Sequence, residues 1–454
     1  MAEIILPGTY IKVFDEGLVS AGAVSTGNIG IVGTASKGPL NEVVLISSFA
    51  EARSHFGEAG SYNPKSDDNL SLVRTLEQAF NNGGKTVYAV RIGTGSAKVA
   101  KLDLKGGTTK LLTLEGQTLG TFGNGITATV ADGDDGLELV ISDATTEEKY
   151  AADSVTAAAE AINERSTLVS ATFSKEGTLS KIEDAPLSGG ADGEKVGDKE
   201  YKTGLELLEN DIINIVLMAG KDAASASLLA AHLKKTAGNK RERIGVLGAT
   251  GVEATDKNVA SDRIILASPG IKAKTFDSTT QKEVQVGLPS SYMAAAVAGL
   301  MASLPVQSSP TNKVLAISGL TDIYNTGKLE KLVQNRVLAI EQREGFRVVK
   351  GITTATNTAW HQITTRRIVD YAIYGVRSGC NPYIGKLNNE RVRNAMKATL
   401  DAFLTRMVND EALISYELDV TATRAEQIQG IVQVNMTLRP TFSIDFIKVN
   451  MYLG

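Results

Sequence analysis

The sequence has little of what metal centres and redox sites require. Cys380 is the only cysteine, and the histidines, His55, His232 and His361, lie in different segments without metal-ligand spacing. These counts exclude an intrachain disulfide and a cysteine-cluster metal site. We expect each histidine to be a surface or structural residue. A single cysteine in 454 residues is typical of a chain made in a reducing cytoplasm.

The chain also lacks an excess of either charge and any long apolar run. The formal net charge is −4, whereas a nucleic-acid-binding domain normally presents a basic face. The longest apolar runs, near residues 212–219 and 293–304, are shorter than the ~20 residues that cross a bilayer. No secretory signal is visible at the start. We therefore expect no nucleic acid contact and no direct membrane insertion.

Motifs of catalysis and cofactor binding are absent or defective. No G-x-S-x-G nucleophile elbow occurs. NNGGKT at residues 81–86 imitates a phosphate-binding loop, but Ala79 replaces its first glycine and a strand pattern follows. RIGTGSAK at residues 91–98 places Lys98 at the third glycine position of a dinucleotide-binding loop. DGDDG at residues 132–136 misses the spacing of a calcium loop. We expect no catalytic residue, no cofactor and no metal. We therefore expect that the protein is not an enzyme.

What the sequence does contain is strand and helix patterns that alternate in two separate blocks. The first block, residues 28–97, has strand patterns at 28–34, 43–46 and 86–92 and an amphipathic helix at 70–81. The second, residues 191–345, has helices at 202–208, 224–235 and 290–304 and strands at 212–218, 244–247 and 263–267. This order predicts an α/β sheet.

The two blocks are separated by residues 98–190, which are rich in Thr, Gly and acidic residues. Strand patterns at 126–130 and 137–141 and a helix at 154–164 predict an inserted, mostly β domain. The character of the sequence changes again after residue 345. There we expect strands at 347–349, 353–356 and 414–420, helices at 365–375 and 388–408, and a turn or short helix at 423–428.

Both ends of the chain have strand patterns without a local partner. Apolar residues alternate at 432–438 and again at 442–446, and residues 3–14 form a matching apolar segment. Residues 17–27 are Gly/Ser-rich, which is typical of a flexible connector. Two strand-like ends favour strand addition between copies. The alternative is that both ends pair within their own domain, because edge strands are normally covered.

Three stretches in order resemble the sheath proteins of contractile phage tails and related injection machines. They are LSGGADG at residues 187–193, SSYMAAAVAGLMASLPVQSSPTNK at 290–313, and NPYIGKLNNERVRNAMKATLDAFL at 381–404 with ALISYELDV after it. The resemblance covers nearly the whole chain except the insertion. It implies a multidomain α/β fold. This has a discontinuous, non-catalytic subtilisin-like α/β domain, an inserted mostly β domain, and an α+β C-terminal domain with extended terminal strand arms.

The implied domains follow the composition changes. They are an N-terminal arm and linker at 1–27, the α/β domain at 28–97 and 191–345, the insertion at 98–190, a tube-facing C-terminal domain at 346–440, and a C-terminal arm at 441–454.

The resemblance also implies a function and partners. The expected function is a structural subunit that polymerises helically around an inner tube and contracts to drive the tube through a target cell envelope. The partners would be further copies of the chain, the tail tube protein, and the baseplate and tail-terminator proteins. The expected location is the tail of a virion or phage-like particle assembled in the host bacterial cytoplasm.

The resemblance assigns roles to three sets of residues. The inter-subunit strand arms would include Ile4, Leu6, Tyr10, Ile11, Val13, Phe442, Ile444, Phe446, Ile447 and Val449. The hinge linker would include Gly17, Gly22 and Gly27. The tube-facing candidates are Arg391, Arg393 and Lys397, for which a solvated helix face is the alternative. In the most specific form, residues 441–449 leave their own subunit and residues 431–438 stay in the sheet of the C-terminal domain.

Two other classes of function stay open on the sequence alone. One is an enzyme on the α/β domain, either a hydrolase or a nucleotide-dependent protein, for which the sequence offers no site. The other is a non-contractile structural or adhesive polymer with the β-rich insertion as an outward-facing binding domain.

Overall fold

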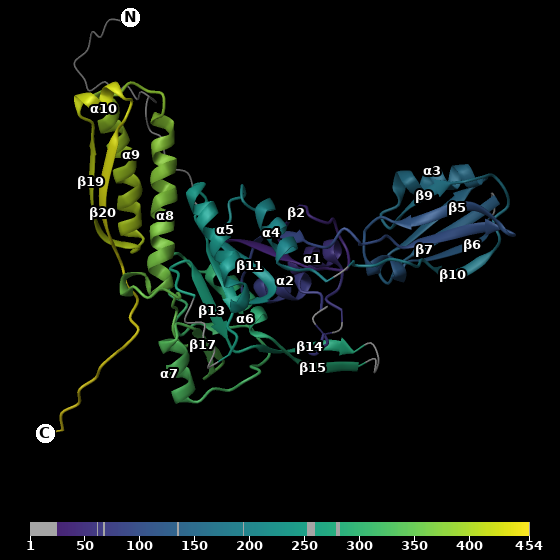
Figure 1. The fold of residues 1–454 in the computed structure, drawn as a ribbon, viewed down its shortest axis with the longest axis horizontal. Coiled ribbons are helices and arrows are strands. Elements are labelled where there is room, and N and C mark those ends of the chain that lie inside the picture. Colours follow the sequence, from purple (N-terminus) through teal and green to yellow (C-terminus); the bar gives the residue numbers. More distant parts are fainter. Residues whose placement is uncertain are drawn as a thin grey trace, which may run out of the picture. The chain divides into compact units, whose positions relative to one another are not determined.

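A computed structural model describes residues 25–60, 62–66, 69–133, 136–193, 195–251, 259–277 and 282–453. The described chain divides into two compact units (Figure 1). The first, called the α/β unit here, comprises residues 25–363 and 444–453. The second, called the C-terminal unit, comprises residues 364–443.

A nine-stranded sheet forms the centre of the α/β unit. Its spatial order is β16 (Val314–Leu315), β18 (Phe346–Val348), β17 (Leu338–Gln342), β13 (Ile264–Ser268), β12 (Ile244–Gly248), β11 (Ile215–Asp222), β1 (Asn28–Gly33), β3 (Thr86–Arg91) and β2 (Val43–Ile46). The strands from β17 to β3 run parallel, whereas the pairs β17–β18, β16–β18 and β2–β3 are antiparallel. Every residue of β12 and β13 is buried, as expected for central parallel strands covered on both faces.

Helices cover both faces of this sheet. On one face, α1 (Phe49–Phe56), α2 (Leu72–Asn81) and α6 (Ser290–Ser303) share a core with Ile29 and Ile31 of β1. On the other face, α4 (Asp198–Leu207), α5 (Ala226–Gly238) and α7 (Thr326–Gln334) share a core with Val32. The crossover from β1 to β3 therefore uses the face opposite to that used by the crossover from β11 to β12. Strand order reverses between β1 and β11, which makes this the topological switch point of the sheet.

The insertion is a β sandwich with one helix. One sheet contains β4 (Lys101–Gly106), β5 (Thr109–Gly116) and β9 (Val169–Phe173), and the other contains β10 (Ile182–Pro186), β6 (Thr127–Gly133), β7 (Gly136–Ser142) and β8 (Glu147–Ala152). The helix α3 (Val155–Arg165) and both sheets contribute to one core, which includes Leu112, Ile141 and Ile162. A separate hairpin, β14 (Ile271–Asp277) and β15 (Lys282–Leu288), extends the α/β unit.

The C-terminal unit pairs two long helices with a two-stranded sheet. Its elements are α8 (Ile363–Cys380), α9 (Glu390–Asn409), β19 (Leu413–Thr421), α10 (Arg424–Ile428) and β20 (Gln433–Pro440). The buried face of α9 includes Met396, Leu400, Phe403 and Met407, as its periodicity predicts. Val392, expected on the same face, is half-buried.

One predicted strand is wrong. Residues 353–356 form no strand, because the buried Thr353 instead bonds a loop: its N–H donates to His361 O and its hydroxyl to Trp360 O. Residues 442–446 make no strand within this subunit, and their predicted pairing with another copy stays a prediction. The expected boundary at residue 346 falls before β18, which belongs to the nine-stranded sheet. In the part of the chain that the structure describes, no helix has the length and apolarity to cross a membrane.

Candidate subunit interface

The hairpin of β19 and β20 is a sheet with two open edges. Leu418 pairs with Met436 and Val420 with Val434. Leu418, Val420 and Val434 pack in one apolar cluster with Met396 and Leu400 of α9. The hydroxyl of Tyr416 donates to Asp401 on α9 at 2.6 Å. Among the described residues, no further strand pairs with the outer edge of either strand. Unpaired N–H and C=O groups along such edges can accept an extended segment of another chain.

The segment after β20 is extended and apolar, and its side chains are exposed. Phe442, Ile444, Phe446, Ile447 and Val449 are between 57% and 81% exposed. No strand is formed between residue 441 and residue 453. Contiguous exposed apolar groups normally mark an interaction site. The exposed, unpaired apolar side chains of these five residues are what a donated strand requires before it binds a partner. In this subunit the segment does not pair with a strand of its own chain.

Asp445 of this segment makes side-chain contacts with the α/β unit. The Asp445 side chain is only 12% exposed, and it accepts a hydrogen bond from Gln362 Nε2 at 3.2 Å. Lys350 Nζ lies 3.6 Å from the same carboxylate and 5.0 Å from the centroid of the Phe446 ring. The pair is largely excluded from water, so its attraction is screened less than that of a surface pair. Asp445 thus anchors the start of the exposed segment to the α/β unit.

The three basic residues of α9 have different surroundings. Arg391 is exposed. Arg393 folds back to donate to Asn388 Oδ1 at 2.9 Å, and Lys397 lies 3.8 Å from Asp419 on β19. The structure therefore does not gather them into one basic cluster, and exposed pairs of this kind contribute only about 0–1 kcal/mol.

Sequence reasoning missed an apolar group in the C-terminal unit. Ile384 and Leu387 in the α8–α9 loop and Ile428 in α10 are each more than three-quarters exposed. Asn388 Nδ2 donates to Ile431 O at 2.9 Å, which joins this loop to the segment after α10. Apolar residues within the Gly/Asn-rich stretch IGKLNN were the available signal, because a solvated loop seldom needs them.

The predicted N-terminal arm and most of the predicted hinge lie outside the described residues. This applies to Ile4, Leu6, Tyr10, Ile11, Val13, Gly17 and Gly22. Gly27 is described, and a Cβ added to it would lie 2.5 Å from Ala302 O at the end of α6. Gly27 is therefore needed for close packing on α6.

The histidines do not form a catalytic or metal-binding group in the described part of the chain, where no cluster of three potential metal ligands occurs. His232 is buried with its Nε2 3.3 Å from the Arg243 guanidinium. Arg243 also donates to the carbonyl oxygens of Leu208 and Asp211. Burial and the neighbouring guanidinium lower the pKa of His232 to about 3. A neutral, buried imidazole of this kind has a structural role.

Three family models match most of the chain. The phage tail sheath protein central domain matches residues 194–354, the phage tail sheath C-terminal domain matches 355–454, and the domain III N-terminal region of the tail sheath protein Gp18 matches 26–92. The chain belongs to the phage tail sheath protein family. The sheath models leave out residues 93–193, which contain the insertion.

Solved structures of sheath proteins share the fold of this sheath chain. The sheath tail protein DSY3957 from Desulfitobacterium hafniense is 18% identical, with a TM-score of 0.71 over 96% of this chain and 100% of that chain. The sheath tail protein Lin1278 from Listeria innocua is 17% identical, with a TM-score of 0.67 over 93% of each chain. The helical sheath of the anti-feeding prophage in its contracted state is 14% identical, with a TM-score of 0.61 over 99% of each chain. No curated protein matches by sequence.

Proposed function

We propose that this sheath chain polymerises helically around an inner tube and contracts to drive the tube through a target cell envelope. The observation that carries the proposal is that one subunit has both a strand-like segment that could be donated and a sheet that could accept one. An apolar segment has no partner strand, and a two-stranded hairpin has two open edges. The anti-feeding prophage protein, which shares the fold, forms a helical sheath that contracts.

Strand addition gives such a polymer its connections. Residues 442–449 of one copy would pair with the β19–β20 hairpin of another, and the apolar segment at residues 3–14 would supply a second strand. Each backbone hydrogen bond contributes a net ~0.5–1.5 kcal/mol. The donating and accepting surfaces differ, so the contact does not close on itself and propagates as a helix or as stacked rings.

Contraction, in this proposal, is a rigid-body movement of the α/β domains. The mesh of exchanged strands persists, while the connector with Gly17 and Gly22 acts as a hinge. The α/β domain would resemble subtilisin in fold and carry no proteolytic site. Tube contact would come from the C-terminal unit, with Arg391, Arg393 and Lys397 as candidates. The exposed Ile384 and Leu387 lie in the loop that precedes this helix.

The remaining parts of the proposal concern the particle. The chain would be the sheath of a phage tail or of a contractile injection particle, assembled in the host cytoplasm. Its further partners would be the tube, baseplate and tail-terminator proteins. A non-contractile polymer would also use strand addition. Only a contractile sheath should be found at two lengths and diameters in negative-stain images taken before and after mild denaturant.

The experiment is a deletion of residues 442–454, examined by negative-stain electron microscopy. The full chain should form striated tubes, and the shortened chain should remain a folded monomer with an unchanged circular dichroism spectrum. A variant with the same residues replaced by a Gly/Ser segment of equal length controls for solubility and should also fail to assemble. Deletion of residues 1–15 tests the other arm in the same way. Tubes formed by all the variants would contradict strand donation.

A further inference from the structure

An exposed apolar patch lies at one end of the C-terminal unit, where α10 closes the hairpin (Figure 1). Ile384 and Leu387 of the α8–α9 loop and Ile428 of α10 are each more than three-quarters exposed, and Ile431 is 41% exposed. Asn388, next to Leu387, donates to Ile431 O at 2.9 Å, which joins the loop to the segment after α10. The four apolar residues are called the α10-end patch here. Exposed apolar groups that lie together normally mark an interaction site.

The tip of the same chain is also apolar and exposed. Met451, Tyr452 and Leu453 are 85%, 91% and 100% exposed. In the proposed strand donation, residues 442–449 occupy the hairpin of another copy, and this tip extends beyond them. What the tip contacts there depends on the direction in which the donated strand runs.

Strand direction decides which end of the hairpin the tip reaches. β19 runs towards α10, and β20 runs away from it. A donated strand that is antiparallel to β20 therefore ends beside α10. One that is antiparallel to β19 ends beside Ile414, at the opposite end of the hairpin. Antiparallel pairs are slightly more stable per residue than parallel ones, so these two arrangements are the ones to compare.

Side-chain contacts favour the outer edge of β20. On β19, the Tyr416 hydroxyl donates to Asp401 of α9 at 2.6 Å, and Asp419 lies 3.8 Å from Lys397 of α9. The side-chain hydrogen bonds and ion pairs of β20 in the described chain involve α10 and β19 and leave α9 untouched. A strand added to β20 would therefore displace none of the contacts between the hairpin and α9.

The pattern of the donated segment matches the two faces of β20. Met436 and Leu438 are half-buried and alternate with exposed residues along this strand. Residues 442–449 and β20 both have eight residues, and pairing them end to end in antiparallel order places Phe446 opposite Met436 and Ile444 opposite Leu438. Opposite residues share a face, so apolar side chains meet apolar side chains. A shift of one residue would move both donated side chains to the exposed face.

The same register gives Asp445 a new partner. Asp445 would lie opposite Thr437, and Arg439 would be its diagonal neighbour, within reach of a long side chain. In the subunit, Arg439 lies 3.6 Å from Glu417, and both side chains are largely exposed. Such a surface pair contributes little and is readily exchanged. Arg439 of the acceptor can therefore take the place of Lys350 beside the Asp445 carboxylate.

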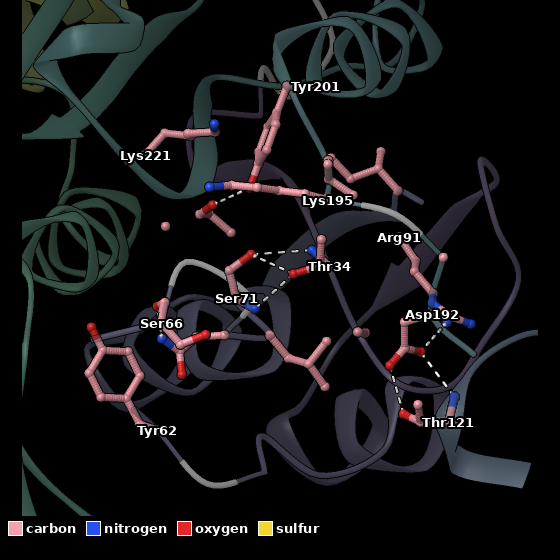
Figure 2. Close-up of a pocket in the computed structure, with 18 of the residues that line it drawn as sticks. Thr34, Tyr62, Ser66, Ser71, Arg91, Thr121, Asp192, Lys195, Tyr201 and Lys221 are labelled. Atoms are coloured by element: carbon pink, nitrogen blue, oxygen red, sulfur yellow. Dashed lines mark hydrogen bonds and ion pairs between the residues drawn. The ribbon is translucent and has the colours of Figure 1, made fainter. Parts of the chain in front are cut away.

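The cavity of about 760 Å³ at the carboxyl end of the central sheet is less suited to an apolar tip (Figure 2). In its wall, Asp192 accepts from Thr121 N at 3.0 Å and lies 3.4 Å from Arg91. Elsewhere in the lining, Thr34 N donates to the Ser71 hydroxyl at 3.2 Å. Apolar side chains entering this cavity would remove water from polar groups without offering them a partner. At the α10-end patch, they would cover apolar surface instead.

We propose that the α10-end patch is the docking site for residues 451–453 of a second copy of this chain. The donated strand adds antiparallel to the outer edge of β20, in the register described above. Met451 then comes level with Ile431, and Leu453 with the C-terminal end of α10. Lys448 points inward from the new edge strand, a feature that discourages addition of a further strand. This inference rests on the proposed strand donation and assigns it an edge, a direction and a contact for the tip.

Disulfide cross-linking within assembled tubes tests the direction of the donated strand. Chains with Met451→Cys are mixed with an equal amount of chains with Ile431→Cys, assembled, oxidised and separated on a non-reducing gel. We expect this mixture to give a cross-linked dimer. Met451→Cys mixed with Ile414→Cys should give none, because Ile414 lies at the other end of the hairpin. Met451→Cys mixed with the unaltered chain controls for reaction with the native Cys380.

Substitutions test whether the patch and the tip contact each other. The triple variant Ile384→Ser, Leu387→Ser, Ile428→Ser should raise the lowest concentration at which tubes form by at least about tenfold, because apolar side chains stay in water. A chain ending at residue 450 should show the same increase. The two changes together should raise this concentration no further than either alone, since both remove one contact. Ile323→Ser alters an isoleucine of the α/β unit that is 71% exposed and should assemble as the unaltered chain does.

Three outcomes would overturn the proposal. A dimer from Met451→Cys with Ile414→Cys would place the donated strand on β19. Additive effects of the patch variant and the shortened tip would mean that another segment, such as residues 3–14, covers the patch. Normal tubes from both variants, folded by their melting temperatures, would show that the contact is unnecessary.

Failure of this docking is distinguishable from failure of strand donation itself. If a chain lacking residues 442–454 still forms tubes, strand donation is wrong. If tubes require these residues but give no dimer between Met451→Cys and Ile431→Cys, only the docking of the tip on the patch is wrong.

Discussion

Gly375 allows the two long helices of the C-terminal unit to touch. It lies on α8 directly against the ring of Phe403 on α9, and an added Cβ would overlap that ring. We expect Gly375→Ala to lower the free energy of unfolding by roughly 1–3 kcal/mol, because an overpacked contact forces the ring or a helix to move. Thermal melts followed by circular dichroism would measure the loss.

Gly327 provides the matched control for this substitution. It lies in the first turn of α7, where the nearest atom to an added Cβ is 3.9 Å away. Gly327→Ala should be neutral or stabilise by about 0.5–1 kcal/mol, because alanine loses less backbone entropy in a helix. Equal stability of the two variants would show that the Gly375 contact is not tight.

His232 links stability to pH. Its pKa is about 3 in the folded chain, whereas an unfolded histidine titrates near 6.5. The unfolded state therefore binds a proton first as the pH falls. We expect the free energy of unfolding to decrease below about pH 6.5, by up to ~1.4 kcal/mol per pH unit until the folded pKa is reached.

Urea unfolding of the His232→Gln variant would test this dependence. Between about pH 6.5 and 5, where carboxylates contribute less, the free energy of unfolding of the variant should change less with pH than that of the unaltered chain. His55 is exposed, so His55→Gln should leave the slope as it is. An unchanged slope in His232→Gln would mean that other groups account for the acid sensitivity.

One proline substitution tests whether the exposed segment after β20 forms a strand in the assembled sheath. Ile447 is 81% exposed and makes no strand in the subunit. Ile447→Pro should leave the melting temperature unchanged but abolish tube formation, because proline cannot donate a ladder hydrogen bond. Ile447→Val keeps the N–H and the β-branched shape, so it should assemble. Tubes of normal length from the proline variant would exclude pairing at this position.

Strong periodicity explains which elements the sequence predicted well. The helices expected at 70–81, 154–164 and 290–304 are present as α2, α3 and α6. The strand expected at 212–218 is shifted to Ile215–Asp222. The apolar Ile213 is buried before the strand begins, while the strand's polar end resembles a turn in sequence. The β14–β15 hairpin was missed although Val284, Val286 and Leu288 alternate along β15, because the connection STTQ at residues 278–281 has no glycine or asparagine turn signal.

The candidate sites differed in how far local sequence could reveal them. The alternation of residues 442–446 after Pro440 indicated a segment without a partner. The open edges of β19 and β20 had no comparable signal, because only the folded unit shows that no further described strand pairs with them.

The whole-molecule consequence of strand donation is that a chain without its C-terminal segment can accept a neighbour but cannot be a donor. Mixing a small fraction of chain lacking residues 442–454 into the full chain should therefore shorten tubes in proportion to that fraction. Length distributions from electron micrographs would measure the effect. The control is the same fraction of Ile447→Val chain. Unchanged lengths would mean that the shortened chain does not enter the lattice or that donation is unnecessary.

The contacts of Asp445 set a condition on strand donation. In the isolated subunit its carboxylate is held by Lys350 and Gln362. Residues 442–449 include Asp445, so pairing of this whole segment with a neighbouring hairpin would require the carboxylate to leave both partners. Residues 446–449 would therefore pair first, and residues 442–445 would follow only when the neighbour's hairpin replaces the contacts of Asp445.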